Sequence, residues 1–175
     1  MRHLDALSIS IGVLGGVAVL LTATVVPVPV WVIFIAWASF FILGGGGAGL
    51  VKSIASNLTG IVIASAALLV SHAAGGGVAV TAVAVGVGSA VMVQASKISL
   101  LSKIPAIVWG FASTVGTAAA TGHDITTTSL SNPALVAALA MVLGAVFGIA
   151  SQYAAVVMTA RSAAPAAEPA TEGRP

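Results

Sequence analysis

Residues 53–71, SIASNLTGIVIASAALLVS, are an uncharged stretch bounded by Lys52 and His72. A membrane hydrocarbon core about 30 Å thick is crossed by roughly 20 helical residues, which rise about 1.5 Å each. The stretch therefore has the length and the apolar character of one membrane-spanning helix. The whole chain shares this character, because 59% of its 175 residues are hydrophobic and only 6% are charged. This composition leaves too few polar residues to cover a soluble globule.

Charged residues, prolines and glycine clusters divide the rest of the chain into similar stretches. We expect an all-α fold, a bundle of about six transmembrane helices, in one membrane domain of residues 1–160. Residues 161–175 are rich in Ala, Pro and Glu without an apolar period, so they are predicted to be a disordered cytoplasmic tail. The predicted spans are 6–26, 30–43, 53–71, 78–95, 104–121 and 134–160, of which the second is short.

The basic residues predict how these spans are oriented. With six spans, both termini and alternate loops share one side of the membrane. Loops on the opposite side carry His72, His123 and Asp124 instead of Lys or Arg. The positive-inside rule therefore predicts that both termini are cytoplasmic. All six Lys and Arg residues fall on the predicted cytoplasmic side: Arg2, Lys52, Lys97, Lys103, Arg161 and Arg174.

Small residues recur at helical spacing within the spans. In lipid, helices associate through faces where Gly, Ala, Ser and Thr let backbones approach closely. Such faces serve ordinary packing more often than a pore, and a GxxxG pair in an apolar segment is a common chance match. The stripes are Gly12 and Gly16 in the first span; Ser56, Gly60, Ala64, Ala67 and Ser71 in the third; Ala79, Ala82, Gly86 and Ala90 in the fourth; Ala106, Gly110, Thr114, Thr117 and Thr121 in the fifth; and Ala137, Gly144, Gly148, Ser151 and Ala155 in the sixth.

The third and fifth stripes share a register. A shift of fifty residues lays Gly60 on Gly110 and Ser71 on Thr121. If this register extends to the neighbouring spans, spans two and three repeat as spans four and five. Both pairs pass through a cytoplasmic loop in the same direction, so the sequence predicts a possible parallel two-helix repeat.

Four consecutive glycines, Gly44, Gly45, Gly46 and Gly47, follow the short second span. Each glycine costs about 1 kcal/mol relative to alanine within a helix, so we expect a helix break here. One interpretation is a flexible cytoplasmic turn. The other is a discontinuous helix whose freed backbone groups face a water-filled cavity, as at transporter binding sites. The equivalent place in the fourth span carries Gln94, an amide near a helix end.

Two segments resemble a known family. The run WASFFILGGGGAGLVK at residues 37–52, followed by SNLTG at 56–60, resembles the first half of the YcdZ-like family of small bacterial inner-membrane proteins. The run MVQASKISLLSKIP at 92–105, followed by ASTVG at 112–116, is similar to a later part of that family. The glycines replace a Cys-Pro-Gln segment there, so no role of those side chains carries over. The resemblance implies an inner-membrane location and a family of unknown function.

Residues that support catalysis are scarce. The chain has no Cys, its histidines lack zinc-site spacing, and its Ser and Thr residues have no base to activate them. The predicted spans contain no Asp, Glu, Lys, Arg or His, whereas proton-coupled carriers place ionisable groups within the membrane. We therefore expect no enzyme activity, no proton coupling, no metal or cofactor and no nucleic-acid partner.

Uncharged polar residues within the spans are the remaining candidates. They suggest a passive channel or facilitator for a small uncharged or weakly charged solute, whose hydration shell amide and hydroxyl groups would replace. For Asn57, a hydrogen bond to a neighbouring helix is the simpler role, worth about 0.6 kcal/mol. The alternative function is a non-transporting membrane partner subunit or assembly protein. Expected partners are the lipid bilayer, a small solute and further copies of the chain. The candidate lining residues are Asn57, Thr59, Gln94, Thr114 and Thr117.

Overall fold

A computed structural model describes residues 2–163, which form six α-helices and one short 3₁₀ helix. The all-α prediction is confirmed for this part of the chain. Most of the predicted tail, residues 164–175, lies outside the described residues, while residues 161–163 belong to the last helix. The helices are α1 (His3–Thr24), α2 (Val30–Ile42), α3 (Gly46–Ala73), α4 (Val78–Ala95), α5 (Ile104–Thr121) and α6 (Pro133–Ala163), with η1 (Ser99–Leu101) between α4 and α5.

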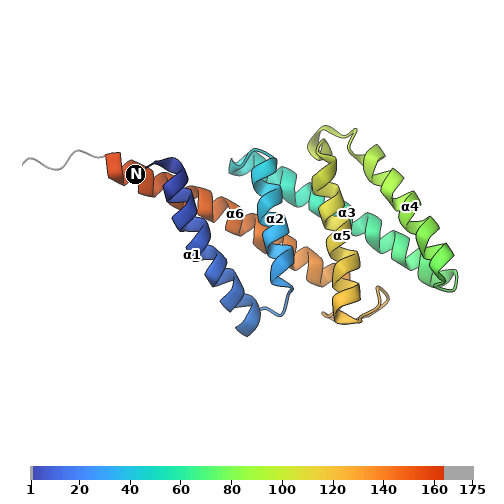
Figure 1. Cartoon of the computed structure of the whole chain (residues 1–175). Coiled ribbons are helices and arrows are strands. Elements are labelled where there is room, and N and C mark those ends of the chain that lie inside the picture. Colours follow the sequence, from blue (N-terminus) through green and yellow to red (C-terminus); the bar gives the residue numbers. More distant parts are fainter. Residues whose placement is uncertain (1, 164–175) are drawn as a thin grey trace, which may run out of the picture.

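Five of the helices are long and apolar enough to cross a membrane, and α2 is shorter. With 13 residues, α2 is roughly 20 Å long. By contrast, α3 has 28 residues and α6 has 31, so both exceed a core of about 30 Å and must tilt. Both long helices run obliquely across the molecule in Figure 1.

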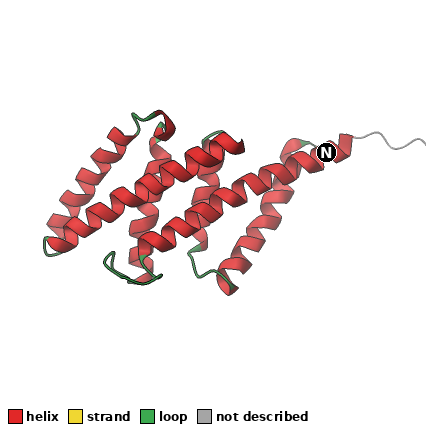
Figure 2. Ribbon diagram, turned by 180° about the vertical axis from the view of Figure 1, so that it is seen from behind, coloured by secondary structure: helices red, strands yellow, loops and turns green. Residues whose placement is uncertain are grey.

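The helices form two layers. In one layer, α1, α2, α5 and α4 stand side by side, while α6 and α3 cross behind them (Figure 1). The view from behind shows the two long helices in front (Figure 2). The chain starts at one end of the bundle and reverses at each connection, so consecutive helices run in opposite directions. The N-terminus and the α2–α3 and α4–α5 connections lie at one end, and the other three connections lie at the opposite end.

Glycines bring the layers into backbone contact. A Cβ atom added to Gly60 of α3 would overlap the carbonyl oxygen of Ile107 in α5. Likewise, a Cβ atom added to Gly144 of α6 would overlap the carbonyl oxygen of Ile33 in α2. Helix association in lipid depends on such close approach, because hiding apolar side chains from lipid contributes little. Accordingly, α3 packs most extensively on α5, and α6 on α2.

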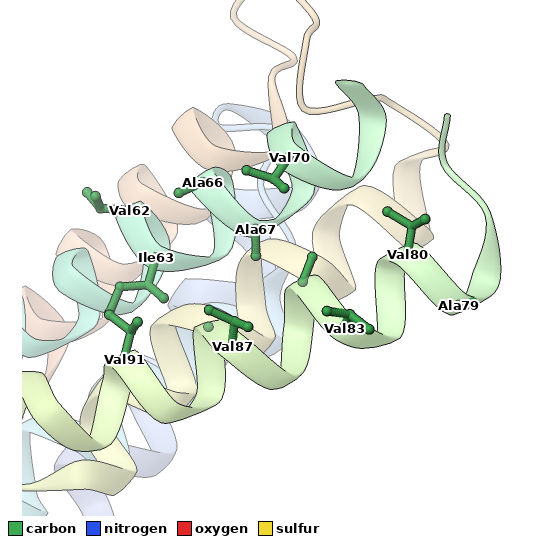
Figure 3. A pocket seen from close by; sticks show the side chains of 12 residues that line it. Val62, Ile63, Ala66, Ala67, Val70, Ala79, Val80, Val83, Val87 and Val91 are labelled. Carbon is green, nitrogen blue, oxygen red and sulfur yellow. The ribbon is translucent and has the colours of Figure 1, made fainter. Parts of the chain in front are cut away.

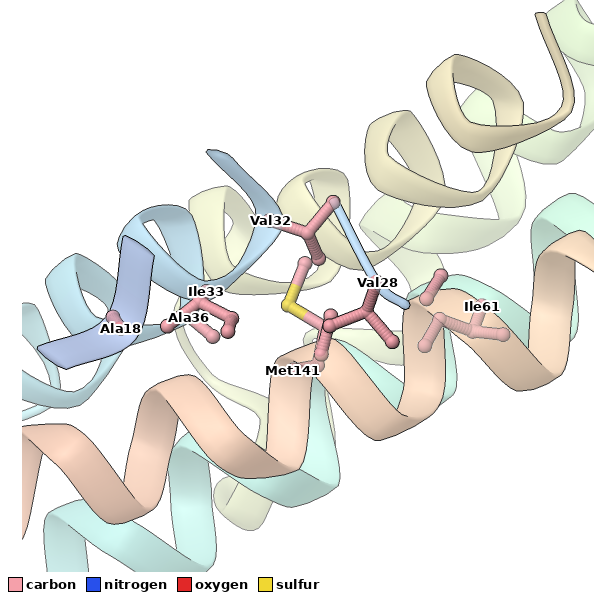
Figure 4. Packing of buried hydrophobic residues seen from close by; sticks show 9 residues of the cluster. Ala18, Val28, Val32, Ile33, Ala36, Ile61 and Met141 are labelled. Atoms are coloured by element: carbon pink, nitrogen blue, oxygen red, sulfur yellow. The ribbon is translucent and has the colours of Figure 1, made fainter. Parts of the chain in front are cut away.

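The apolar core lies where α2, α3 and α6 meet (Figure 4). Met141 of α6 reaches toward Val32 of α2, and Ile33 and Ile61 complete the contact from α2 and α3. Met141, Val32 and Ile33 are at most 1% exposed. The interior is therefore closely packed with side chains at the middle of the bundle.

The backbone contacts at Gly60 and Gly144 occupy equivalent places in two similar halves of the molecule. An offset of 74 residues in the sequence aligns Ile33 with Ile107, and it aligns all six buried residues of α2 with buried residues of α5. An offset of 84 residues aligns Gly60 with Gly144, and it aligns all nine buried residues of α3 with buried residues of α6. The helix contacts correspond in the same way, since α4 packs on α3 as α1 packs on α6.

The halves α1–α2–α3 and α4–α5–α6 are therefore structural repeats. Each half contains an odd number of helices, and consecutive helices run in opposite directions. Equivalent helices of the two halves consequently point in opposite directions, as α1 and α4 do in Figure 1. This relation is an inverted repeat of three helices, an arrangement found in several families of secondary transporters.

The inverted repeat corrects the predicted parallel repeat. A shift of fifty residues does relate the buried stripes of α3 and α5, because these helices pack on each other through similar glycine faces. The same shift fails for the neighbouring pair. It moves the buried Val32, Ile33 and Ala36 of α2 onto exposed positions of α4.

Candidate functional site

A closed network of three polar side chains joins α2 to α3. The Ser39 hydroxyl donates to Asn57 Oδ1 at 3.2 Å, and the Ser53 hydroxyl donates to Ser39 Oγ at 3.0 Å. Asn57 Nδ2 completes the ring by donating to Ser53 Oγ at 3.3 Å. All three side chains are fully buried. The network satisfies groups that would be costly to leave unpaired in a low-dielectric interior.

The backbone of Asn57 also meets the other half of the molecule. A Cβ atom added to Gly110 of α5 would overlap the Asn57 carbonyl oxygen, so the two backbones touch at this point. The network of Ser39, Ser53 and Asn57 therefore borders the surface between the two repeats. The candidate list includes Asn57 but misses its two serine partners. Ser39 has a visible signal, since it is the only hydroxyl in the otherwise apolar helix 30–42.

Thr114 and Thr117 lie on the buried face of α5 but differ in their hydrogen bonds. The Thr114 hydroxyl donates to the carbonyl of Gly110 at 3.0 Å. The Thr117 hydroxyl is buried and has no hydrogen-bond partner within residues 2–163. Two further buried hydroxyls, those of Ser56 and Ser113, share that property in the described part of the chain. Ser113 is also a polar residue of the predicted fifth span but is not among the candidate lining residues, and its lack of a partner is visible only in the structure.

Thr59 and Gln94 do not join this buried region. Thr59 is half-buried and donates its hydroxyl to the carbonyl of Ala55 at 2.8 Å. Gln94 is exposed on α4, two positions beyond the buried Met92, and so points away from the bundle. Asn57 is fully buried by comparison. The described structure therefore does not bring the candidate lining residues Asn57 and Gln94 together.

The four glycines form the turn between α2 and α3. Helix α2 ends at Ile42 and α3 begins at Gly46, and Gly44, Gly45 and Gly46 have φ values of 96°, 66° and 62°. Residues other than glycine rarely adopt this left-handed backbone conformation, which explains why glycines occur here. The Gly46 amide donates to Gln152 Oε1 of α6 at 2.7 Å. The freed backbone thus binds a side chain of the other half.

Trp37 packs within the bundle. Its indole Nε1 donates to Ser151 Oγ at 3.0 Å, and its ring lies 5.5 Å from that of Phe147 between centroids. The Ser10 hydroxyl donates to the Ser151 carbonyl at 3.0 Å. Ser151 therefore links α1, α2 and α6.

At the end of the bundle that holds the α3–α4 and α5–α6 connections, the last turn of α3 meets α4 and the α5–α6 loop. His72 Nδ1 lies 3.4 Å from Asp124 Oδ2, and the hydroxyls of Ser71 and Thr81 lie 2.6 Å apart. Hydrogen bonds from the Thr126 backbone amide and hydroxyl, with a smaller contribution from His72, lower the pKa of Asp124 below its ordinary value. A cavity of about 230 Å³ is lined in part by Ser71, His72, Thr81, His123 and Asp124.

An apolar groove of about 620 Å³ separates α3 from α4 (Figure 3). Valine, alanine and isoleucine line it, with Gly88 at its floor near the Phe111 ring. Its lining residues include no side chain that forms hydrogen bonds. The repeat-equivalent position of Gly88 in α1, 74 residues earlier, is Leu14.

The chemistry of the buried region is uncharged throughout. The described residues contain no group of three His, Cys, Asp or Glu side chains placed to hold a metal ion. Hydroxyl and amide groups both donate and accept hydrogen bonds, whereas they neutralise no charge. The arrangement is suited to neutral hydrogen-bonding molecules.

Comparison with known proteins identifies the family. The model of a family described as "Protein of unknown function (DUF1097)" matches residues 8–156. The chain belongs to the DUF1097 family. The matched residues include α2, α3, α4 and α5 entirely and most of α1 and α6. No curated protein and no solved structure matches the chain. The match therefore confirms that the chain belongs to a family of unknown function, and it assigns no activity.

Proposed function

We propose that this DUF1097 protein is a facilitator for a small uncharged or weakly charged solute. The observation that carries the proposal is the inverted repeat, with uncharged polar side chains buried where its halves meet. Transporters with inverted repeats bind substrates near the membrane midplane, at the interface between the repeats. The network of Ser39, Ser53 and Asn57 borders that interface, and α5 carries further buried hydroxyls without a partner in the described part of the chain.

Transport in this protein requires movement of the halves. Side chains fill the middle of the bundle, and hydrogen bonds at Ser151 and Gly46 join α2 and α3 to α6. The contact between His72 and Asp124 joins α3 to the loop between α5 and α6. A path opens when one half rocks against the other, which is how inverted repeats give alternating access. The uncharged membrane interior supports facilitated diffusion without a coupling proton.

The proposed setting is the bacterial inner membrane, with both termini in the cytoplasm. The structure supports a multi-pass chain through its apolar helices. The orientation rests on the positive-inside rule, since Arg2, Lys97 and Lys103 lie at or near connections of the same end of the bundle.

Solute flux into liposomes tests the function. Purified protein is reconstituted and challenged with glycerol, urea and acetamide, and stopped-flow light scattering follows the change in vesicle volume. The proposal expects at least one solute to enter faster than it enters protein-free liposomes of the same lipid. If none of the three solutes entered faster than it enters protein-free liposomes, the facilitator function would be ruled out.

Small residues on the outer helices favour a second candidate, a non-transporting subunit that binds other helices. Ser8, Gly12 and Gly16 are exposed on α1, and a shift of 74 residues takes them to exposed Ala82, Gly86 and Ala90 on α4. Exposed small-residue faces permit close contact with a further helix. Gly12→Leu and Gly86→Leu would then dissociate a complex that cross-linking in native membranes detects, while a monomer unaffected by both changes would count against this candidate.

A further inference from the structure

Most helical hydroxyls in this protein are bonded to their own helix. A serine or threonine within a helix usually donates to the carbonyl four residues earlier, which removes the cost of burying the hydroxyl. Nine described residues do so: Thr22, Thr24, Thr59, Ser65, Ser89, Thr114, Thr121, Thr159 and Ser162.

Ser113 and Thr117 of α5 depart from this habit. Both side chains are fully buried, and neither hydroxyl has a hydrogen-bond partner within residues 2–163. An unpaired buried hydroxyl is destabilising, because it loses water without gaining a replacement. The two residues are four apart in one helix, so their hydroxyls lie on the same face, one turn apart. The structure thus holds two neighbouring unsatisfied groups in its interior.

The inverted repeat shows what Ser113 lacks. Moving 74 residues takes Ser39 to Ser113, so the two serines occupy equivalent positions. Ser39 is bonded to Ser53 and Asn57. The residues equivalent to this pair, 84 positions further on, are Ala137 and Met141. One half therefore satisfies its serine internally, while the other half replaces both partners by apolar side chains.

We propose that Ser113 and Thr117 form a binding subsite for a small neutral solute that both donates and accepts hydrogen bonds. The subsite rests on the proposed facilitator function and names its solute contacts. Hydroxyls without a protein partner bind a polar guest without first breaking an internal hydrogen bond. They carry no charge to offset the dehydration of an ion, so polyols, ureas and primary amides are the fitting chemical class.

The test removes each hydroxyl with little change in shape, through Ser113→Ala and Thr117→Val. The control is Ser65→Ala, because the Ser65 hydroxyl is bonded to the Ile61 carbonyl at 2.8 Å and lies outside the subsite. Liposomes containing each variant are challenged with glycerol, urea and acetamide. Osmotic water flux and the melting temperature in detergent are measured alongside.

The subsite predicts opposite effects on flux and stability. Loss of one hydrogen bond to the solute should slow flux about tenfold in Ser113→Ala and Thr117→Val. Their melting temperatures should equal or exceed that of the wild type, since an unpaired buried group has been removed. Ser65→Ala should keep wild-type flux. A structural role for the hydroxyls would instead lower the melting temperature of both variants.

The outcomes separate the subsite from the function. Wild-type flux that both variants retain overturns the subsite and leaves the facilitator standing. Absence of wild-type flux for all three solutes overturns the facilitator and the subsite with it. If the variants reduce osmotic water flux and leave solute flux unchanged, the hydroxyls bind water, and the assignment to a solute is overturned. Melting temperatures that fall in both variants show that the hydroxyls are already partnered, and this also overturns the subsite.

Discussion

Single glycines decide whether the two layers can meet. At Gly60, an added methyl group would overlap backbone atoms of α5, which have no freedom to move aside as a flexible side chain does. Gly47, in the first turns of the same helix, has open space around its Cβ position. The same residue type therefore has different consequences at two places in α3.

Gly60→Ala should destabilise the protein by about 1–3 kcal/mol, the usual range for overpacking a close contact. Gly47→Ala should be neutral or slightly stabilising, because alanine is the better helix former. The midpoint of thermal unfolding in detergent measures both. Equal midpoints for the two variants would show that α3 and α5 are not in backbone contact.

Asn57→Leu should clearly reduce solute flux while lowering the free energy of unfolding only slightly. Two side-chain hydrogen bonds are lost, each worth about 0.6 kcal/mol, while Ser39 and Ser53 still bond to each other. An apolar side chain at the interface between the repeats would replace a polar group that borders the proposed solute path. Flux is measured as for the wild type, and unchanged flux at normal reconstitution would remove Asn57 from that path.

Asn57 was predictable from sequence because an amide in an apolar span is rare and must find a partner. Its partners Ser39 and Ser53 follow from the packing of α2 on α3, which no local pattern specifies. Ser113 was harder still, since its lack of a partner depends on Ala137 and Met141 at repeat-equivalent positions.

Among the elements, helix existence was predictable and helix orientation was not. Length, composition and glycine clusters located all six α-helices of the described residues, but not the short η1. The direction in which each face points was less accessible, because the helices are apolar on all sides and have little amphipathic pattern. The predicted small-residue stripe of α3 is buried, whereas that of α4, Ala79 to Ala90, faces outward. Gln94 was misplaced for the same reason.

The α2–α3 turn depends on a contact with α6. Gln152→Leu would leave the Gly46 amide without its acceptor, and a lost hydrogen bond of this kind costs about 1 kcal/mol. Hydrogen exchange at Gly46 should become faster in the variant. Gln94→Leu is the matched control, since Gln94 is exposed and the same substitution there should leave exchange at Gly46 unchanged. Equal exchange in both variants would show that Gln152 does not hold the turn.

At the scale of the whole molecule, the inverted repeat was not predicted from the sequence. Identity between the halves is confined to scattered positions such as Ile33 with Ile107 and Gly60 with Gly144. The offset also changes from 74 to 84 residues, because the connection before α6 is longer than the one before α3. The repeat is carried by which positions are buried, a property that only the packed structure displays.

The inverted relation requires that all six helices cross the membrane, including the short α2. The chain lacks Cys, so single cysteines report on each side without background labelling. Pro27→Cys, Ala74→Cys and Thr128→Cys, at exposed positions of one end, should react with a membrane-impermeant maleimide added to intact cells. Lys97→Cys and Ser102→Cys, exposed at the other end, should react only after permeabilisation. Labelling of Pro27→Cys from the inside would show that α1 and α2 do not cross as a hairpin. The first half would then cross the membrane once while α4, α5 and α6 cross it three times, so the two halves would not be equivalent and the inverted repeat would fail.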